Sequence, residues 1–191
     1  MKALAIAATG MKAQETNVTV ISNNIANMRT TGYKQQRADF QDLLYQTLRR
    51  QGSSTSETGT QVPNGVQIGS GVRVVSTPRV MTQGDPESSG GDYDVAIRGE
   101  GFFQVLLPDG RTAYTRDGSF TTDSSGNLVT QDGYTVMPQI TFPANSSNIT
   151  ISNTGSVQVT VGSSSATTTL GQLNLARFTN KGGLEAMGDN L

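Results

Sequence analysis

The first 34 residues contain a heptad pattern that constrains the fold more than any other feature of the chain. Apolar residues occupy seven of the eight seam positions in four consecutive heptads, and only Gln14 interrupts them. These seam residues are Leu4, Ala7, Met11, Val18, Ile21, Ile25 and Met28. So narrow a stripe is typical of a helix that packs lengthwise along another helix. The sequence predicts a long N-terminal coiled-coil-type helix; the alternative is an amphipathic helix lying on the protein's own domain.

The residues that follow the heptads predict where this helix ends. Asn23, Asn24 and Asn27 crowd its last turn, and Asn is a poor interior residue of helices but a good cap. Gly32 follows and can adopt the positive φ that terminates a helix. A new segment is therefore expected to start at Tyr33.

The same stretch resembles the N-terminal signature of the bacterial flagellar rod and hook proteins. The residues that carry the resemblance are Asn23, Asn24, Ile25, Ala26, Asn27, Thr30, Thr31, Gly32 and Tyr33, followed by Lys34. Two later blocks, residues 94–103 and 114–129, also resemble motifs of this family and occur in the expected order. The resemblance thus covers most of residues 1–140 in three separate blocks.

Composition excludes several classes of function. The 191-residue chain has no Cys and no His, so disulfides, Cys-based metal sites and thiol catalysis are ruled out and the commonest general base is missing. A net charge of −1 gives no electrostatic case for nucleic acid or an anionic membrane. No catalytic residues, metal ligands or cofactor are expected, and the protein is not predicted to be an enzyme. Only 34% of residues are hydrophobic, whereas 22 are Gly, which favours turn-rich β structure.

Residues 35–71 combine an apolar segment with a polar one. Phe40, Leu43, Leu44 and Leu48 recur at intervals of three and four residues, so a short helix is preferred over an extended arm for residues 35–50. The Gly/Ser/Thr-rich tract that follows resembles the distal rod members of the family and not the hook members. The resemblance implies an arm between neighbouring subunits, with candidate contact residues Leu48, Arg49, Arg50, Val62, Pro63, Val66 and Ile68.

From Val72 onward the pattern is that of an antiparallel β domain, expected over residues 72–191. Tyr93, Val95 and Ile97 alternate with polar residues, as in a half-buried strand. Residues 102–107 form the most apolar strand candidate, and residues 149–151 and 157–161 read as a hairpin. The whole chain is therefore predicted to be mainly β, with a long N-terminal helix and an extended arm.

The resemblance implies a structural role. Such a protein would polymerise into the distal rod, the drive shaft of the flagellum, with residues 1–34 at the assembly core, residues 35–71 as the arm and the β domain outside. It would contact further copies of itself, other rod proteins, the hook protein and the ring proteins that act as a bushing. The location implied is the periplasm-spanning rod, reached by the flagellar type III apparatus without a cleaved signal peptide.

Two alternatives stay open from the sequence. A proximal rod or hook protein of the same family would share the helix, whereas a secreted β-rich enzyme or carbohydrate-binding module would need a pocket with convergent polar groups. Members of the family usually continue into a C-terminal heptad helix. Because the sequence stops at Leu191, we expect either a fragment or a shortened protein.

Overall fold

The computed structural model describes residues 1–53, 63–162 and 167–191, which form two compact units. The first consists of Met1–Met28 and Gln35–Val80, and we call it the helix–ribbon unit. The second consists of Arg29–Lys34 and Met81–Leu191, and we call it the β domain. The chain therefore leaves the helix–ribbon unit at the end of the helix, contributes six residues to the β domain and then returns.

The N-terminal helix is present as predicted. Helix α1 spans Lys2–Ala26, and its first turns are rich in Ala, the best helix former. Asn27 is the C-cap, and its backbone N–H donates to the carbonyl of Asn23 at 3.1 Å. Gly32 follows with a φ of +73°. The helix thus ends within the Asn cluster, as the sequence predicts. No helix in the described part of the chain is long and apolar enough to cross a membrane.

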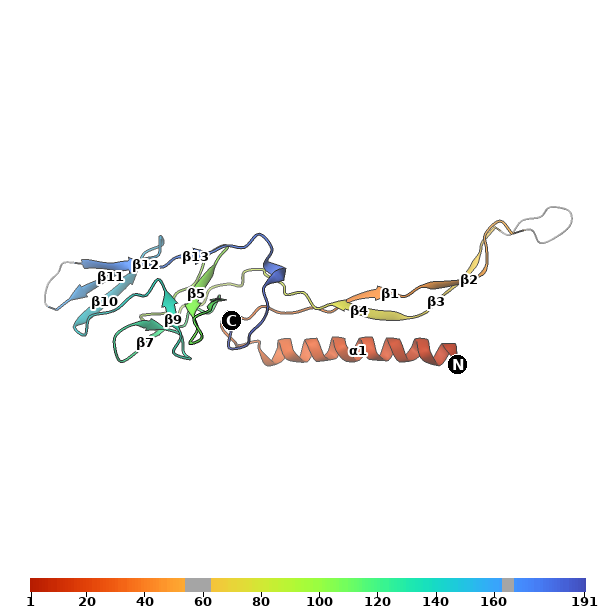
Figure 1. Ribbon diagram of the computed structural model, residues 1–191, viewed down its shortest axis with the longest axis horizontal. Coiled ribbons are helices and arrows are strands. Elements are labelled where there is room, and N and C mark those ends of the chain that lie inside the picture. Colours follow the sequence, from red (N-terminus) through yellow and green to blue (C-terminus); the bar gives the residue numbers. More distant parts are fainter. Residues whose placement is uncertain (54–62, 163–166) are drawn as a thin grey trace. The chain divides into compact units, whose positions relative to one another are not determined.

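A long two-stranded ribbon follows the helix in the same unit (Figure 1). Strand β1 (Asp39–Asp42) pairs antiparallel with β4 (Val72–Ser76), and β2 (Tyr45–Arg49) pairs antiparallel with β3 (Val66–Gly69). At its base, Gln36 and Arg79 form a further antiparallel bridge. Figure 1 shows α1 running alongside β1 and β4; the helix contacts β4, and two of its residues, Ala13 and Val20, are buried.

The short helix preferred for residues 35–50 is wrong, because this segment forms β1 and β2. The spacing of Phe40, Leu44 and Leu48 fits a helical face, yet all three side chains are exposed and define no buried stripe. Pairing partners 17 to 37 residues further along the chain decide the outcome. Pairing with a distant strand has overridden the local pattern. The partner strand Val72–Ser76 is rich in β-branched Val, which favours strand pairing.

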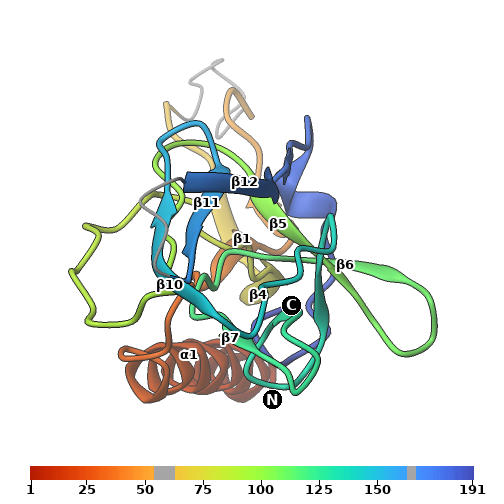
Figure 2. The same cartoon turned by 90° about the vertical axis from the view of Figure 1, so that its left-hand side faces the viewer.

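The β domain contains two antiparallel sheets. The larger has the order β13 (Leu175–Ala176), β5 (Phe102–Leu106), β9 (Thr135–Met137), β8 (Leu128–Val129) and β7 (Thr121–Thr122), with β6 (Thr112–Thr115) also paired to β5. The smaller has the order β10 (Ser146–Ile151), β11 (Ser156–Val161) and β12 (Thr167–Gln172), seen side by side in Figure 2. A 3-10 turn at Lys181–Gly183 follows.

One hydrophobic core serves both sheets. Val136 from the larger sheet and Val157 and Val159 from the smaller are fully buried in the same cluster, where Phe103 and Phe120 meet edge to face with ring centroids 5.0 Å apart. The predicted strand at 102–107 and the hairpin of β10 and β11 are confirmed. The half-buried strand expected over residues 93–98 is wrong, because only an isolated bridge joins Asp94 to Ser119. Its alternation still places Ile97 in the core.

The fold class predicted from the sequence is thus confirmed as mainly antiparallel β with a long N-terminal helix. Strand β4, which the sequence analysis placed at the start of the β domain, instead pairs with β1 in the helix–ribbon unit. The reason is that β4 belongs to the same ribbon as β2 and β3. Backbone hydrogen bonds also join residues up to Val80 to the segment that follows Tyr33.

Candidate assembly surface

The heptad seam lies on the open face of α1. Leu4 is 72% exposed, Val18 60% and Met28 78%. The other seam residues, Ala7, Met11, Ile21 and Ile25, are exposed as well. Large apolar side chains in this number along one face of a helix are costly to leave in water. The seam is therefore a candidate surface for contact with another helix.

The nearly opposite face of α1 packs on the ribbon. Ala13 and Val20 are only 4% and 8% exposed, and Ile6 is half-buried. These three residues also recur every seven positions. They follow the seam residues Leu4, Met11 and Val18 by two positions, about 200° around a helix, and precede the seam residues Ala7 and Ile21 by one, about 100°. The helix thus carries two apolar stripes, and the sequence analysis identified only the exposed one.

Asn24 of the signature connects the helix to the base of the ribbon. Its Nδ2 donates to the backbone carbonyl of Gln36 at 2.6 Å, and its Oδ1 accepts the backbone N–H of the same residue at 2.9 Å. The side-chain amide thus pairs with Gln36 as a neighbouring strand would. This explains why an Asn, a poor helix former, stands in the last turns of α1.

Thr9 makes a second contact with the ribbon near the other end of the helix. Its hydroxyl donates to the carbonyl of Ile6 at 2.7 Å and accepts the backbone N–H of Val72 at 3.3 Å. Gly71, with a φ of +115°, lies against this hydroxyl, and a Cβ built there would be 2.2 Å from Thr9 Oγ1. Neither Thr9 nor Gly71 was singled out from the sequence. The sequence signal that could have pointed to this face of the helix is the second heptad stripe, which flanks Thr9; Gly71 has no such signal. At the N-terminus, Lys2 also donates to the side chain of Gln46.

The second part of the signature, from Thr30 to Lys34, belongs to the β domain. A Cβ on Gly32 would lie 2.7 Å from the backbone nitrogen of Asp117, closer than real Cβ atoms approach. Lys34 Nζ donates to the carbonyl of Thr82 at 2.8 Å, and burial, with the nearby Arg116 charge, lowers the pKa of Lys34. Asn24 and Gly32 thus anchor the two ends of one connection, each to a different unit.

The candidate arm residues lie on the outer half of the ribbon. Leu48 and Arg49 are in β2, Val66 and Ile68 are in β3, and all four side chains are exposed. Arg50 and Pro63 flank these strands and are exposed too, whereas Val62 lies outside the described residues. The structure therefore brings the described arm residues together on one hairpin.

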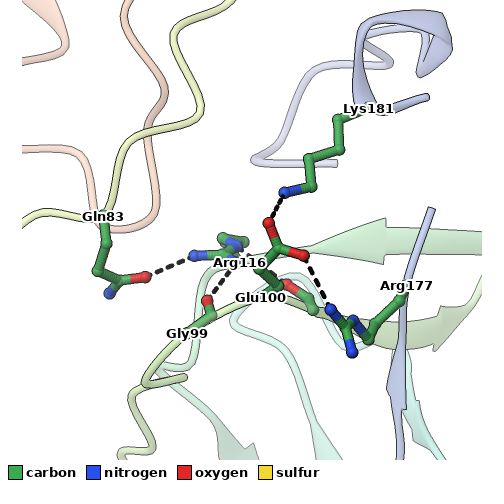
Figure 3. A network of polar contacts seen from close by, with 7 residues as sticks. Gln83, Gly99, Glu100, Arg116, Arg177 and Lys181 are labelled. Atoms are coloured by element: carbon green, nitrogen blue, oxygen red, sulfur yellow. Dashed lines mark hydrogen bonds and ion pairs between the residues drawn. The ribbon is translucent and has the colours of Figure 1, made fainter. Parts of the chain in front are cut away.

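A polar network ties the last segment of the β domain to the loop before β5 (Figure 3). The Glu100 carboxylate accepts from Lys181 Nζ at 2.5 Å and from Arg177 Nη2 at 3.0 Å. These two hydrogen bonds lower the pKa of Glu100 to about 2. Arg116 donates to the carbonyls of Gly99 and Gly101 and to Gln83. Among the residues that the structure describes, no group of three or more acidic side chains could hold a metal ion.

Comparison with known proteins matches two parts of the chain to family models. Residues 4–34 match the model of the flagella basal body rod protein, and residues 96–159 match that of the flagellar hook protein FlgE/F/G D1 domain. The chain is 55% identical over its full length to the flagellar basal-body rod protein FlgG of Caulobacter vibrioides, covering 73% of that protein. The chain belongs to the FlgG family.

More distant relatives support FlgG over the hook protein. FlgG of Bacillus subtilis is 35% identical over 187 residues, which cover 69% of its length. The flagellar hook protein FlgE of Helicobacter mustelae is 43% identical over 130 residues, but these cover only 28% of that protein. The chain is thus a structural subunit of the flagellar basal-body rod. The FlgG matches include the ribbon, which lies between the two matches to family models.

Proposed function

We propose that this FlgG-family chain polymerises into the distal rod and transmits torque from motor to hook through contacts between copies. In this mechanism the seam of α1 packs against helices of neighbouring subunits, at the core of a tube. The observation that carries the proposal is the exposure of all seven seam residues, six of them on a helix whose other face is already occupied by the ribbon and Met28 just after its end. Contacts between different surfaces of successive copies generate an open helical assembly.

The remaining parts take the roles implied by the family. Residues 35–71 form the arm that contacts neighbouring subunits along the tube, with the exposed Leu48, Val66 and Ile68 as its apolar contacts. The β domain lies outside the helical core. The partners are the other rod proteins, the hook protein and the ring proteins that serve as a bushing. The chain reaches the periplasm-spanning rod through the flagellar type III apparatus with its N-terminus retained. No chemistry is required of it.

A charge placed in the seam tests this proposal. Val18→Glu introduces a carboxylate into the centre of the seam, and burying it between helices without a partner is costly. We expect the wild-type chain to form sedimenting polymers at high concentration and the variant to remain in the supernatant. Thr19→Glu is the matched control, because Thr19 is exposed, lies off the seam and bonds only to Glu15 within the helix in the contacts found.

Two outcomes would contradict the proposal. The first is a wild-type chain that stays monomeric at every concentration reached. The second is equal sedimentation of Val18→Glu and the wild-type chain, which would mean that the seam is not shared between copies.

A further inference from the structure

Helix α1 has two apolar stripes, and either could dock on the ribbon. The stripe that faces the ribbon consists of Ile6, Ala13 and Val20, whereas the exposed stripe contains the bulkier set Leu4, Met11, Val18 and Ile25. Burial of apolar area is non-directional and grows with the area removed from water. Hydrophobic burial alone would therefore favour docking the seam onto the ribbon, where it would be unavailable to other copies.

Two polar contacts favour the observed orientation. The Asn24 amide pairs with both backbone groups of Gln36, and the Thr9 hydroxyl accepts the N–H of Val72. Asn24 and Thr9 lie on the same face of the helix, 15 residues apart, which is about 60° around the axis. Both contacts are partly buried. If the helix turned its seam toward the ribbon, both side chains would point away from these backbone groups.

The contact between Thr9 and Val72 also depends on Gly71. Thr9 Oγ1 lies 2.2 Å from the place where a Cβ of residue 71 would be, so this hydroxyl reaches Val72 only because residue 71 has no side chain. The ribbon changes partners at this point, since Leu43 N–H donates to the carbonyl of Gly71 between the pairs β1–β4 and β2–β3. The backbone N–H of Val72 is thereby presented to the helix.

We propose that Asn24 and Thr9 are positioning residues that select which face of α1 docks on the ribbon and so keep the seam available for assembly. The proposal rests on the proposed function for the use of the seam, but the selection itself is a property of the single chain. Removal of either contact allows the bulkier stripe to compete for the ribbon.

Thiol labelling measures this selection, because the chain has no Cys of its own. Val18→Cys places one thiol on the seam and Val20→Cys places one on the docked face, each in the full chain at a dilution where it is monomeric. We expect rapid maleimide labelling at position 18 and slow labelling at position 20. Thr9→Val and Asn24→Ala should raise the rate at position 20 by about fivefold for each hydrogen bond lost.

Three controls make the result specific. Thr19→Val removes an exposed hydroxyl that, like that of Thr9, bonds to a carbonyl of the preceding turn but lies away from the docked stripe, so both rates should stay unchanged. Thr9→Ser keeps the hydroxyl and should retain the wild-type contrast. A thiol from Val157→Cys, in the core of the β domain, should label slowly in every variant.

The proposal is overturned if Thr9→Val and Asn24→Ala leave the rate at position 20 unchanged. It is also overturned if the thiol at position 157 accelerates equally, because the contacts would then support the whole fold. Its failure differs from failure of the proposed function. If Val18→Glu blocks assembly but Thr9→Val and Asn24→Ala leave the labelling rates unchanged, only face selection is refuted. If the labelling rates change as expected but the chain assembles despite Val18→Glu, only the seam as an interface is refuted.

Discussion

At the scale of single residues, Gly32 combines two constraints that only glycine satisfies. Its φ is +73°, and its missing Cβ leaves room for the backbone of Arg116 and Asp117. Gly32→Ala should destabilise the β domain by more than the ~1 kcal/mol expected for Ala in this left-handed region. Gly110→Ala is the matched control, since Gly110 has a φ of +82° and no atom within 4 Å of its Cβ position. Urea unfolding that gives equal losses for both variants would contradict the close packing.

Glu100 gives a prediction for pH dependence. Hydrogen bonds from Lys181 and Arg177 hold the pKa of Glu100 near 2, below its ordinary value of 4.5. A depressed pKa in the folded state means that the stabilisation is present above pH 4.5 and is lost as pH falls through about 2. Glu100→Gln should therefore lower the urea midpoint at pH 7, and the difference from the wild-type chain should shrink between pH 4.5 and 2. A difference that stays constant over this range would be inconsistent with the network in Figure 3.

Local sequence patterns predict some of these residue-scale features. An Asn cluster followed by Gly32 indicates the end of the helix and a positive φ, because both follow from local backbone preferences. The approach of Gly32 to Asp117 joins residues 85 positions apart, and the pairing of Asn24 with Gln36 depends on where the ribbon starts. Neither contact leaves a local pattern. The family resemblance marks both residues without giving the reason for them.

At the scale of elements, periodicity predicts a segment well when the partner is close in sequence. The sequence predicts the hairpin of β10 and β11 because Asn153, Thr154 and Gly155 lie between its two apolar stretches, and the structure has a turn there in which Gly155 N–H donates to the carbonyl of Ser152. For residues 35–50 the local spacing predicts a helix, whereas the strands that pair with β1 and β2 begin only at Val66. Spacing of three and four residues is then accidental, and the distant strand decides the conformation.

The shared core of the two sheets leads to a prediction about cooperativity. Val136 belongs to the larger sheet and Val157 to the smaller, and both are fully buried in one cluster. Val136→Ala and Val157→Ala should each cost about 2–3 kcal/mol. Because one core joins the sheets, both variants should shift a single unfolding transition. Urea unfolding measured by circular dichroism and by Tyr fluorescence tests this. Non-coincident transitions for the two probes would show that the smaller sheet unfolds independently.

At the scale of the whole molecule, the family signature is divided between the two units. Residues 1–28 belong to the helix–ribbon unit, and residues 29–34 belong to the β domain. Sequence analysis treated residues 1–34 as one assembly segment, since the heptads and the signature are continuous there. Contacts in space divide it, because Lys34 and Gly32 bond or pack within the β domain.

This division predicts that two N-terminal deletions, differing by six residues, will behave differently. Removal of residues 1–28 takes away α1 but leaves every core residue of the β domain, along with Gly32 and the hydrogen bond from Lys34 to Thr82. The β domain should keep its thermal midpoint, because its ten-residue core cluster draws nothing from the helix. Removal of residues 1–34 also deletes the packing of Gly32 on Asp117, so the midpoint should fall. Differential scanning calorimetry of both shortened chains measures this. Loss of the β-domain transition in the shorter deletion would mean that the helix is part of one globular fold, and the seam could not then be reserved for other copies.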